Sequence, residues 1–430
     1  MARPRNALNA RPVSSATPRA ARARPRADSA TFGSTDCLLH LKPGRDKSLR
    51  QHHPWVFSGA IATVDGNPGV GDTVTIVGSD GAFLCHAAYS PGSQIRARAW
   101  SFDARESIAA DFFARRVQTA IARRATMLDA AHTGCRIIHG EADGLPGVIA
   151  DRYDDVVVLQ LSAAGAERWR DCIVQAIATL AHPRCIYERS DAEVRTLEGL
   201  PLRNGVLFGR VPETVTLLED GLCYRIDIEA GQKTGFFLDQ RDNRAAVRAI
   251  AHDRTVLNMF CYTGGFTLSA LAGGARDVLS VDSSADALAR ARDNLARNPG
   301  LPQERAQWRE ADAFTELRRL RDAGATFDLI VLDPPKFAPT AHHVDRAARA
   351  YKDINLLALK MLRVDGLLAT FSCSGGVDTL LFRKIIAGAA SDARADAVVE
   401  RQFTASADHP VVLSFPEGEY LKGLLLRRTA

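Results

Sequence analysis

The sequence predicts a mixed α/β protein in three folded parts: a small β-barrel, a compact α+β region, and a domain built on a parallel sheet. Three observations support this prediction. Short alternating apolar runs broken by glycine turns fill residues 37–103, helical and extended patterns mix over residues 104–230, and strand-type runs alternate with helical ones over residues 231–430. A chain of 430 residues is long enough for two or three such domains.

The overall composition is that of a soluble globular protein, with 46% hydrophobic and 24% charged residues and a mean hydropathy of −0.11. No stretch approaches the ~18 uninterrupted apolar residues of a membrane span, and the N-terminus lacks the apolar core of a secretory signal. The eight cysteines are scattered and lack zinc-ligand spacing. We therefore expect a cytoplasmic protein with no membrane partner and no metal site.

Positive charge is concentrated at the N-terminus. Residues 1–30 hold seven arginines and one acid, which leaves 48 basic and 49 acidic residues in the remaining 400. Residues 1–34 show no hydrophobic periodicity and are predicted to be disordered. A targeting leader, a basic tail that attracts RNA, and a start codon assigned too early all remain open for this segment.

The barrel is predicted from residues 37–103. Its strand-type runs include Thr73–Val77 and the run that begins at Phe83, and Asp80-Gly81 between them is a hairpin signal. Basic side chains could line one face of this barrel, and either an RNA-binding face or an ordinary solvated surface is consistent with the pattern. These basic side chains are Lys42, Arg45, Arg50, His52, His53, Arg96 and Arg98.

The middle region, residues 104–230, mixes helical and extended patterns. Apolar periodicity predicts helices over Ile108–Thr126 and Ala166–Leu180, and strands over Val156–Leu161 and Leu222–Ile228. A compact α+β domain accounts for this mixture.

From residue 231 onward the alternation of strands and helices predicts a parallel sheet with right-handed crossovers. Ligands bind such sheets at the carboxyl ends of the strands, so the informative residues should follow strands. The expected strands are Thr255–Phe260, Val278–Asp282, Gln307–Glu310, Phe327–Asp333, Leu367–Ser372, Val398–Phe403 and Leu424–Arg428.

The first of these strands runs into a glycine turn at Tyr262-Thr-Gly-Gly-Phe266, and Asp282 ends the next strand 18 residues after Gly264. Glycines allow the backbone to approach a ligand closely, and an acid at this offset is suited to ribose hydroxyls. The turn lacks the complete GxGxxG pattern that cradles a pyrophosphate. The sequence therefore favours S-adenosylmethionine over NAD.

Acids also follow the third and fourth strands. Asp312, with Ala313 and Phe314 behind it, could meet the adenine, although Asp312 could equally be the N-cap of the next helix. Asp333-Pro334-Pro335 could form a rigid ledge that holds a carboxylate against a planar base, or simply end the strand.

Cys373 follows the fifth strand, where its thiol would face the same crevice as Asp333. Flanking hydroxyls, glycine amides and the next helix N-terminus are expected to favour the thiolate, although a lone cysteine is often inert core. A thiolate that adds to pyrimidine C6 makes C5 nucleophilic, and a carboxylate beside N3 stabilises the adduct. The base that removes the C5 proton is left open among Lys336, Lys352, Asp353 and water.

Nine motifs in order give the chain, from about Cys37 to its C-terminus, a close resemblance to the bacterial 23S ribosomal RNA large-subunit methyltransferase I family, which uses S-adenosylmethionine to make 5-methylcytosine. The motifs are His53-Pro-Trp-Val-Phe-Ser-Gly59, Tyr89-Ser-Pro-Gly-Ser-Gln-Ile-Arg-Ala-Arg98, Gly140-Glu-Ala-Asp-Gly-Leu-Pro-Gly147, Gly231-Gln-Lys-Thr-Gly-Phe-Phe-Leu-Asp-Gln-Arg241, Tyr262-Thr-Gly-Gly-Phe266, Asp333-Pro-Pro-Lys-Phe337, Tyr351-Lys-Asp-Ile-Asn355, Thr370-Phe-Ser-Cys-Ser374 and Ala407-Asp-His-Pro410.

The resemblance implies an RNA-binding PUA-like domain, a central α+β domain, and a Rossmann-like class I methyltransferase domain whose seven-stranded sheet contains one antiparallel strand. It implies that Cys373 is the nucleophile, with Asp333 as the second catalytic residue, and that 23S ribosomal RNA or a large-subunit precursor is the partner. A homodimer is left open. The expected cofactor-binding residues are Lys233, Thr234, Phe236, Asp239, Tyr262, Thr263, Gly264, Gly265, Asp282, Asp312, Ala313 and Asp333. The expected RNA-binding residues are Lys42, Arg45, Arg50, His53, Arg96, Arg98, Lys336 and Lys352.

One feature departs from many RNA cytosine-5 methyltransferases: Lys336, not a cysteine, follows the Asp-Pro-Pro segment, so product release needs another route. Three alternatives remain open. They are methylation of guanine N2, methylation of uracil C5, and a non-catalytic role as an RNA-binding ribosome-assembly factor.

Overall fold

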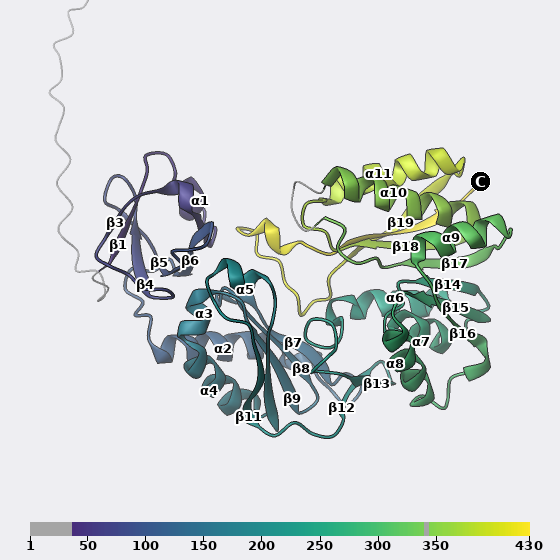
Figure 1. The fold of residues 1–430 in the computed structure, drawn as a ribbon, viewed down its shortest axis with the longest axis horizontal. Coiled ribbons are helices and arrows are strands. Elements are labelled where there is room, and N and C mark those ends of the chain that lie inside the picture. Colours follow the sequence, from purple (N-terminus) through teal and green to yellow (C-terminus); the bar gives the residue numbers. More distant parts are fainter. Residues whose placement is uncertain (1–36, 339–343) are drawn as a thin grey trace, which may run out of the picture.

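The computed structural model describes residues 37–338 and 344–430, so the predicted disorder of residues 1–34 lies outside the described residues. Three regions follow one another along the chain (Figure 1). The predicted α/β class with a preceding β-barrel is confirmed. Within the two described ranges, no helix is long and apolar enough to cross a membrane.

The N-terminal region is a six-stranded sheet in the order β2-β6-β5-β4-β1-β3, with buried apolar side chains such as Leu39, Val74 and Ile76 in its core. The turn expected at Asp80-Gly81 joins β4 and β5, and Gly81 has a φ of 77°, which favours glycine. The elements are β1 (Leu38–Leu41), α1 (Lys47–Arg50), β2 (Trp55–Phe57), β3 (Ile61–Asp65), β4 (Thr73–Val77), β5 (Phe83–Tyr89) and β6 (Ile95–Ser101).

The central region is a five-stranded sheet in the order β11-β10-β9-β8-β7, with α2 and α4 packed together beside it. The single helix predicted over Ala166–Leu180 is two helices, because the chain breaks at Trp169. The elements are α2 (Ala110–Arg124), β7 (Gly134–His139), β8 (Val148–Tyr153), β9 (Val156–Leu161), α3 (Ala164–Arg168), α4 (Arg170–Ala181), β10 (Cys185–Ser190), α5 (Val194–Leu197) and β11 (Arg203–Gly209).

A hairpin of β12 (Val215–Glu219) and β13 (Leu222–Ile226) connects the central region to the C-terminal one. Its buried side chains Leu217 and Tyr224 belong to a core cluster that also contains Val158 of the central sheet and Val256 of the C-terminal sheet. The two regions therefore share one continuous core.

The C-terminal region is a seven-stranded sheet in the order β16-β15-β14-β17-β18-β20-β19. The first five of these strands are parallel, and β20 is antiparallel to both of its neighbours, as the resemblance implies. The elements are α6 (Arg241–Ile250), β14 (Thr255–Met259), α7 (Gly265–Ala272), β15 (Asp277–Asp282), α8 (Ala285–Ala296), β16 (Ala306–Glu310), α9 (Ala313–Asp322), β17 (Phe327–Leu332), α10 (Val344–Met361), β18 (Leu362–Ser372), α11 (Thr379–Ala393), β19 (Ala397–Thr404) and β20 (Lys422–Arg428).

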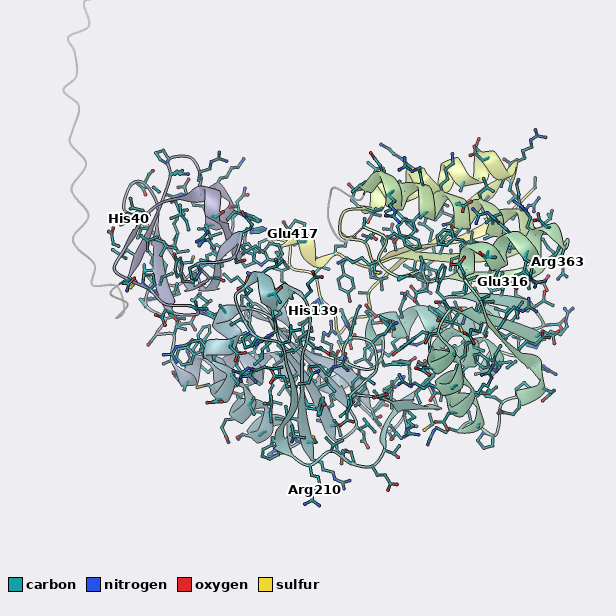
Figure 2. All side chains as sticks on the ribbon, in the orientation of Figure 1. His40, His139, Arg210, Glu316, Arg363 and Glu417 are labelled. Carbon is teal, nitrogen blue, oxygen red and sulfur yellow. The ribbon has the colours of Figure 1, made fainter. Side chains whose placement is uncertain are left out.

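Between β19 and β20 the chain leaves the sheet as a long segment, yellow in Figure 1, that reaches toward the barrel. Two residues of this segment contact the barrel. Glu417 Oε2 lies 3.1 Å from His53 Nε2, and the ring of Phe415 lies 4.7 Å from that of Trp55. Figure 2 labels Glu417 where the segment approaches the barrel. The segment thus joins the first and third regions directly.

Candidate active site

A cavity of about 370 Å³ opens at the carboxyl ends of β14, β15, β17 and β18, the edge at which the sequence predicts a ligand. It is roofed by the segment that precedes α6 and by residues just before β20. The lining residues are Gln232, Lys233, Phe236, Phe237, Asp239, Gln240, Arg244, Phe260, Cys261, Tyr262, Thr263, Gly265, Phe266, Asp282, Ser283, Asp333, Pro334, Pro335, Lys336, Cys373, Tyr420 and Leu421.

Three non-glycine residues of the lining have left-handed backbone conformations: Lys233 (φ 51°), Phe260 (φ 60°) and Tyr262 (φ 47°). Each such residue costs free energy that the surrounding structure must offset, and such residues cluster at functional sites. Their presence around one cavity supports its choice as the candidate active site.

The glycine turn and Asp282 form one unit. Asp282 accepts hydrogen bonds from the amides of Tyr262 (2.8 Å) and Ser284 (2.9 Å), so the acid at the end of β15 shapes the turn at the end of β14. A Cβ at Gly265 would lie 3.0 Å from Cδ of Arg244. A side chain at this position would therefore require the Arg244 side chain to shift, and the preceding Gly264 has a φ of 84°, which favours glycine.

Asp239 is a buried carboxylate in the cavity wall. Its Oδ2 accepts a hydrogen bond of 2.7 Å from the Tyr420 hydroxyl, while Oδ1 has no partner among the described residues. Burial alone would raise the pKa of Asp239, but the charges of Lys233 and His409 and the Tyr420 hydroxyl outweigh burial and lower it. A buried, ionised oxygen without a partner is suited to a positively charged ligand group.

Asp333 differs from Asp239 in its protonation. Burial, together with the negative charge of Asp239, raises the pKa of Asp333 to about 7, although Gln240 donates a 2.9 Å hydrogen bond to its Oδ1. Two carboxyl groups in one cavity with separated pKa values are able to play different roles. Asp239 remains charged, whereas Asp333 is able to donate a proton near neutral pH.

Cys373 lies at the end of β18 and opens into the same cavity. The expectation that its surroundings favour the thiolate is wrong, because burial raises the pKa of the Cys373 thiol and the nearby Lys233 offsets only part of this effect. The resting group is a thiol, which must lose its proton before it can attack.

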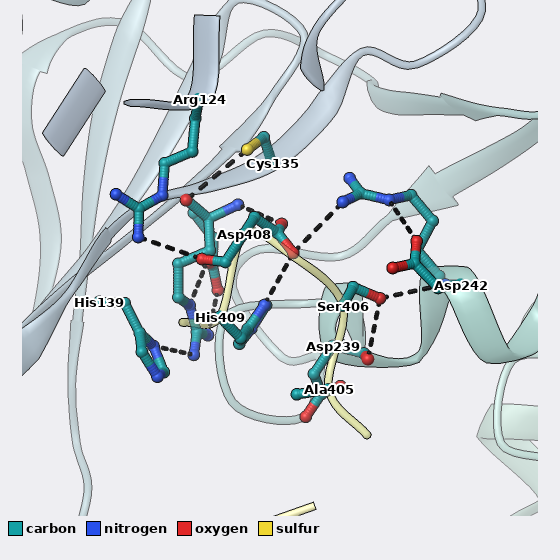
Figure 3. A network of polar contacts seen from close by, with 12 residues as sticks. Arg124, Cys135, His139, Asp239, Asp242, Ala405, Ser406, Asp408 and His409 are labelled. Carbon is teal, nitrogen blue, oxygen red and sulfur yellow. Dashed lines mark hydrogen bonds and ion pairs between the residues drawn. The ribbon is translucent and has the colours of Figure 1, made fainter. Parts of the chain in front are cut away.

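Asp408 and His409 of the Ala407-Asp-His-Pro410 motif lie in a network of polar contacts that also includes Ser406 and Asp239 (Figure 3). The buried Asp408 accepts hydrogen bonds from the amide of Arg136 (2.9 Å) and from His409 Nδ1 (2.9 Å), and it pairs with Arg241 at 3.3 Å. Two residues earlier, the Ser406 amide and hydroxyl both donate to the main-chain carbonyl of Asp239. These contacts hold the segment that follows β19 against Arg136 of β7 and against the main chain of Asp239.

The structure brings most, but not all, of the expected cofactor residues to the cavity. Lys233, Phe236, Asp239, Tyr262, Thr263, Gly265, Asp282 and Asp333 line it, whereas Thr234, Gly264, Asp312 and Ala313 do not. Thr234 donates to Asp151 of β8 at 2.6 Å, and Asp312 caps α9 by accepting from the amide and hydroxyl of Thr315. Asp312 is therefore the N-cap of α9, which is one of the two roles that the sequence left open for it.

The expected RNA-binding residues of the barrel separate into two groups. The prediction that Arg98 contacts RNA is wrong, because Arg98 is 8% exposed and pairs at 3.1 Å with buried Glu198 of the central region. His53 faces Glu417, and Arg96 donates to the carbonyl of Pro91. Lys42, Arg45 and Arg50 are exposed on one stretch around α1.

Sequence reasoning missed two polar residues that shape the site, Gln240 and Tyr420. Gln240 lies within the Gly231–Arg241 motif, which also contains the expected cofactor residues Lys233 and Asp239, so a place for Gln240 in the site could have been anticipated. Tyr420 follows a loop that bears no strand-end signal, and nothing in the local pattern indicates its contact with Asp239.

The sheet order, the glycine turn and the strand-end acids define the class: this is an S-adenosylmethionine-dependent methyltransferase of the Rossmann-like type, preceded by a PUA-like domain. The S-adenosylmethionine-dependent methyltransferase family matches residues 203–402, and the PUA-like domain family matches residues 39–102. The chain belongs to the ribosomal RNA large subunit methyltransferase I family.

Two relatives support this family assignment. The Ribosomal RNA large subunit methyltransferase I of Shewanella denitrificans is 50% identical over 394 residues, which cover 90% of this chain and 98% of the relative. That of Cronobacter sakazakii is 49% identical over 390 residues, with the same two coverages. An S-adenosylmethionine-dependent methyltransferase from Streptococcus mutans has the same fold, with a TM-score of 0.78 at 23% identity, over 91% of this chain and 99% of that one.

The cavity residues fit S-adenosylmethionine on their own chemistry. The unpartnered Oδ1 of Asp239 suits the ammonium group of the methionine part, and the carboxylate of Asp282 beside the glycine turn suits the ribose diol. When bound, the cofactor supplies an electrophilic methyl group. The described residues contain no group of three or more His, Cys, Asp or Glu arranged to hold a metal ion.

Replacing Asp239 by asparagine is expected to weaken the binding of S-adenosylhomocysteine by about 10- to 100-fold, because a charge-assisted contact to the ligand ammonium is lost. Isothermal titration calorimetry measures this change. Asp286→Asn, at an exposed position on α8, is the matched control and should bind as the unaltered protein does. Unchanged affinity in Asp239→Asn would contradict the assignment.

Proposed function

We propose that this chain methylates C5 of a cytosine in 23S ribosomal RNA through a covalent adduct between Cys373 and C6 of the base. The observation that carries the proposal is that Cys373 and Asp333 open into the cavity that also contains the cofactor-binding residues. The choice of large-subunit ribosomal RNA as the substrate rests on the names of relatives that are about 50% identical over 90% of the chain.

The proposed reaction assigns one step to each group. The Cys373 thiolate forms a bond to C6, the C5–C6 double bond opens, and Asp333 donates its proton to N3, which leaves an enamine at C5. C5 then takes the methyl group that bound S-adenosylmethionine would supply. Loss of the C5 proton to a base restores the C5–C6 double bond and expels the Cys373 thiolate, and N3 returns its proton to Asp333.

Among the side chains considered for the final proton removal, Lys336 is the one that lines the cavity. Lys352 pairs with Asp392 at 2.7 Å, and Asp353 pairs with Arg318 at 2.6 Å, so both are engaged on the surface of α10. Lys336 and water therefore remain the proposed acceptors.

The protonation of Asp333 favours cytosine over uracil. N3 of cytosine is an acceptor, so it pairs with a protonated carboxyl group, whereas N3 of uracil carries a hydrogen and requires a carboxylate acceptor. A pKa near 7 keeps a large fraction of Asp333 protonated at neutral pH. Methylation of guanine N2 would leave the cavity thiol without a role.

The test is methyl transfer from S-adenosylmethionine to large-subunit ribosomal RNA that lacks native methylation, with digestion of the product to nucleosides and mass spectrometry. We expect 5-methylcytosine. Recovery of 5-methyluridine or N2-methylguanosine would overturn the assignment of the base, and absence of any methylated nucleoside would favour the non-catalytic alternative.

The exposed basic residues around α1 are the proposed phosphate contacts of the PUA-like domain. Replacing Lys42 and Arg45 together by alanine is expected to lower the slope of log K against log salt by about 2, because each lost phosphate contact removes close to one released counterion. Filter binding or fluorescence anisotropy over a range of salt concentrations measures the slope.

Arg98→Met provides the contrasting variant. Because Arg98 faces Glu198 in the interior, this substitution should leave the salt slope unchanged and lower the free energy of unfolding by about 3 kcal/mol. A reduced slope in Arg98→Met, or an unchanged one in the double variant, would contradict this division of roles.

A further inference from the structure

The loop that carries Cys373 leaves β18 at Ser372 and enters α11 at Thr379. Two of its main-chain carbonyls accept hydrogen bonds from one ammonium group: Lys422 Nζ lies 2.9 Å from the oxygen of Ser374 and 2.5 Å from that of Val377. One side chain therefore ties together both halves of the loop.

Lys422 is an unusual lysine because it is 2% exposed. It occupies the first position of β20, where its Cα pairs with that of Ser372, the residue just before Cys373. Burial lowers the pKa of Lys422, while the neighbouring Cys373, Glu419 and Asp378 act in the opposite direction. A lysine is rarely buried this completely, because its ammonium group loses its hydration. Here the two carbonyls of the Cys373 loop replace part of that hydration, so the position of Lys422 depends on this loop.

The same loop is held from two further directions. The Ser374 hydroxyl accepts a 3.1 Å hydrogen bond from the amide of Ala338, after β17, and lies 2.9 Å from the hydroxyl of Tyr351 on α10. Ser374 is fully buried. Elements from three parts of the sequence thus converge beneath Cys373, and Lys422 supplies the charged contact among them.

We propose that Lys422 is a positioning residue for the transfer reaction: by holding the carbonyls of Ser374 and Val377, its ammonium fixes the loop that presents the Cys373 thiol to the cavity. The inference rests on the proposed function, since it requires Cys373 to be the nucleophile. A displacement of about 1 Å at an attacking atom is able to cost about 10²-fold in rate, so a rigid loop has a large kinetic effect.

The experiment measures how fast, and to what extent, the protein forms a stable adduct with large-subunit ribosomal RNA transcribed with 5-fluorocytidine in the presence of S-adenosylmethionine. Fluorine at C5 cannot leave as a proton does, so the methylated adduct between Cys373 and C6 accumulates. Lys422→Met is compared with the unaltered protein and with Lys384→Met, which removes an exposed lysine from α11. Calorimetry with S-adenosylhomocysteine checks the cofactor site in each variant.

For Lys422→Met we expect adduct formation slowed by about 10- to 100-fold, a final adduct yield equal to that of the unaltered protein, and cofactor affinity within about twofold. Lys384→Met should match the unaltered protein in all three measurements. A merely structural lysine would lower the yield, because fewer molecules are folded, and leave the rate of the folded fraction unchanged. That result would overturn the proposal.

If Lys422→Met does not fold, Lys422→Gln keeps one donor without the charge and is expected to form the adduct at an intermediate rate. A rate equal to that of the unaltered protein in a folded Lys422→Gln would also overturn the proposal. Failure of the unaltered protein to form any adduct would instead refute the proposed function, and the inference with it.

Discussion

Replacing Cys373 by alanine is expected to reduce methyl transfer by at least about 10⁴-fold, because the uncatalysed C5 of cytosine is too weakly nucleophilic to attack a sulfonium without the thiolate adduct. Binding of S-adenosylhomocysteine should remain within about twofold, since the cofactor contacts lie on other residues of the cavity. Tritium transfer from labelled S-adenosylmethionine measures the first quantity, and calorimetry measures the second.

Cys172→Ala is the matched control for this experiment, because Cys172 is a free cysteine on α4 of the central region. It should retain full activity. Substantial methylation by Cys373→Ala would exclude the covalent route and would direct attention to amine methylation, which needs no thiol. Loss of cofactor binding in Cys373→Ala would mean that the substitution had disturbed the cavity, and Cys373→Ser would then provide the comparison.

Replacing Asp333 by asparagine is the second large expected effect, with a loss of about 10²- to 10³-fold in kcat. This is the usual contribution of a positioned general acid, and asparagine cannot supply a proton to N3. Asp322→Asn, at an exposed position at the C-terminal end of α9, is the control. Activity of Asp333→Asn within a few-fold of the unaltered protein would contradict the role of Asp333.

The pH dependence of the methyl-transfer rate follows from the raised pKa values of Asp333 and Cys373. The reaction requires a protonated Asp333, whose pKa is about 7, and an ionised Cys373, whose pKa is raised by burial. Below pH 7 the rate should rise tenfold per pH unit as the thiolate forms. Between pH 7 and the thiol pKa it should stay level, because the gain in thiolate is offset by the loss of the acid.

The thiol provides an independent check on the same pair. The negative charge of Asp333 raises the pKa of Cys373, so Asp333→Asn should lower that pKa and speed alkylation of Cys373 by iodoacetamide below pH 9, while methylation falls. Mass spectrometry of the peptide that contains Cys373 separates it from the other cysteines. Slower alkylation in the variant would show that the two groups do not interact in this way.

The order of the elements, and the edge of the sheet at which the candidate site lies, could be predicted from the sequence. β4, β9 and β15 fall within a residue of the predicted strands, because their alternating or continuous apolar runs lie between clear turn signals. Asp282, Asp333 and Cys373 could be assigned to one cavity because parallel strands bring their carboxyl ends to the same edge, wherever they lie in the chain.

The contacts between groups that lie far apart in the sequence, and the protonation states of those groups, could not be predicted in this way, because they depend on the folded structure. Tyr420 contacts Asp239, 181 residues away in the sequence, Lys422 lies beneath a loop almost 50 residues earlier, and Arg98 is buried against Glu198. Burial raises the pKa values of Asp333 and Cys373, contrary to the expected thiolate. Desolvation and Coulomb interactions depend on everything that surrounds a group in space, whereas a local sequence pattern records only its neighbours along the chain.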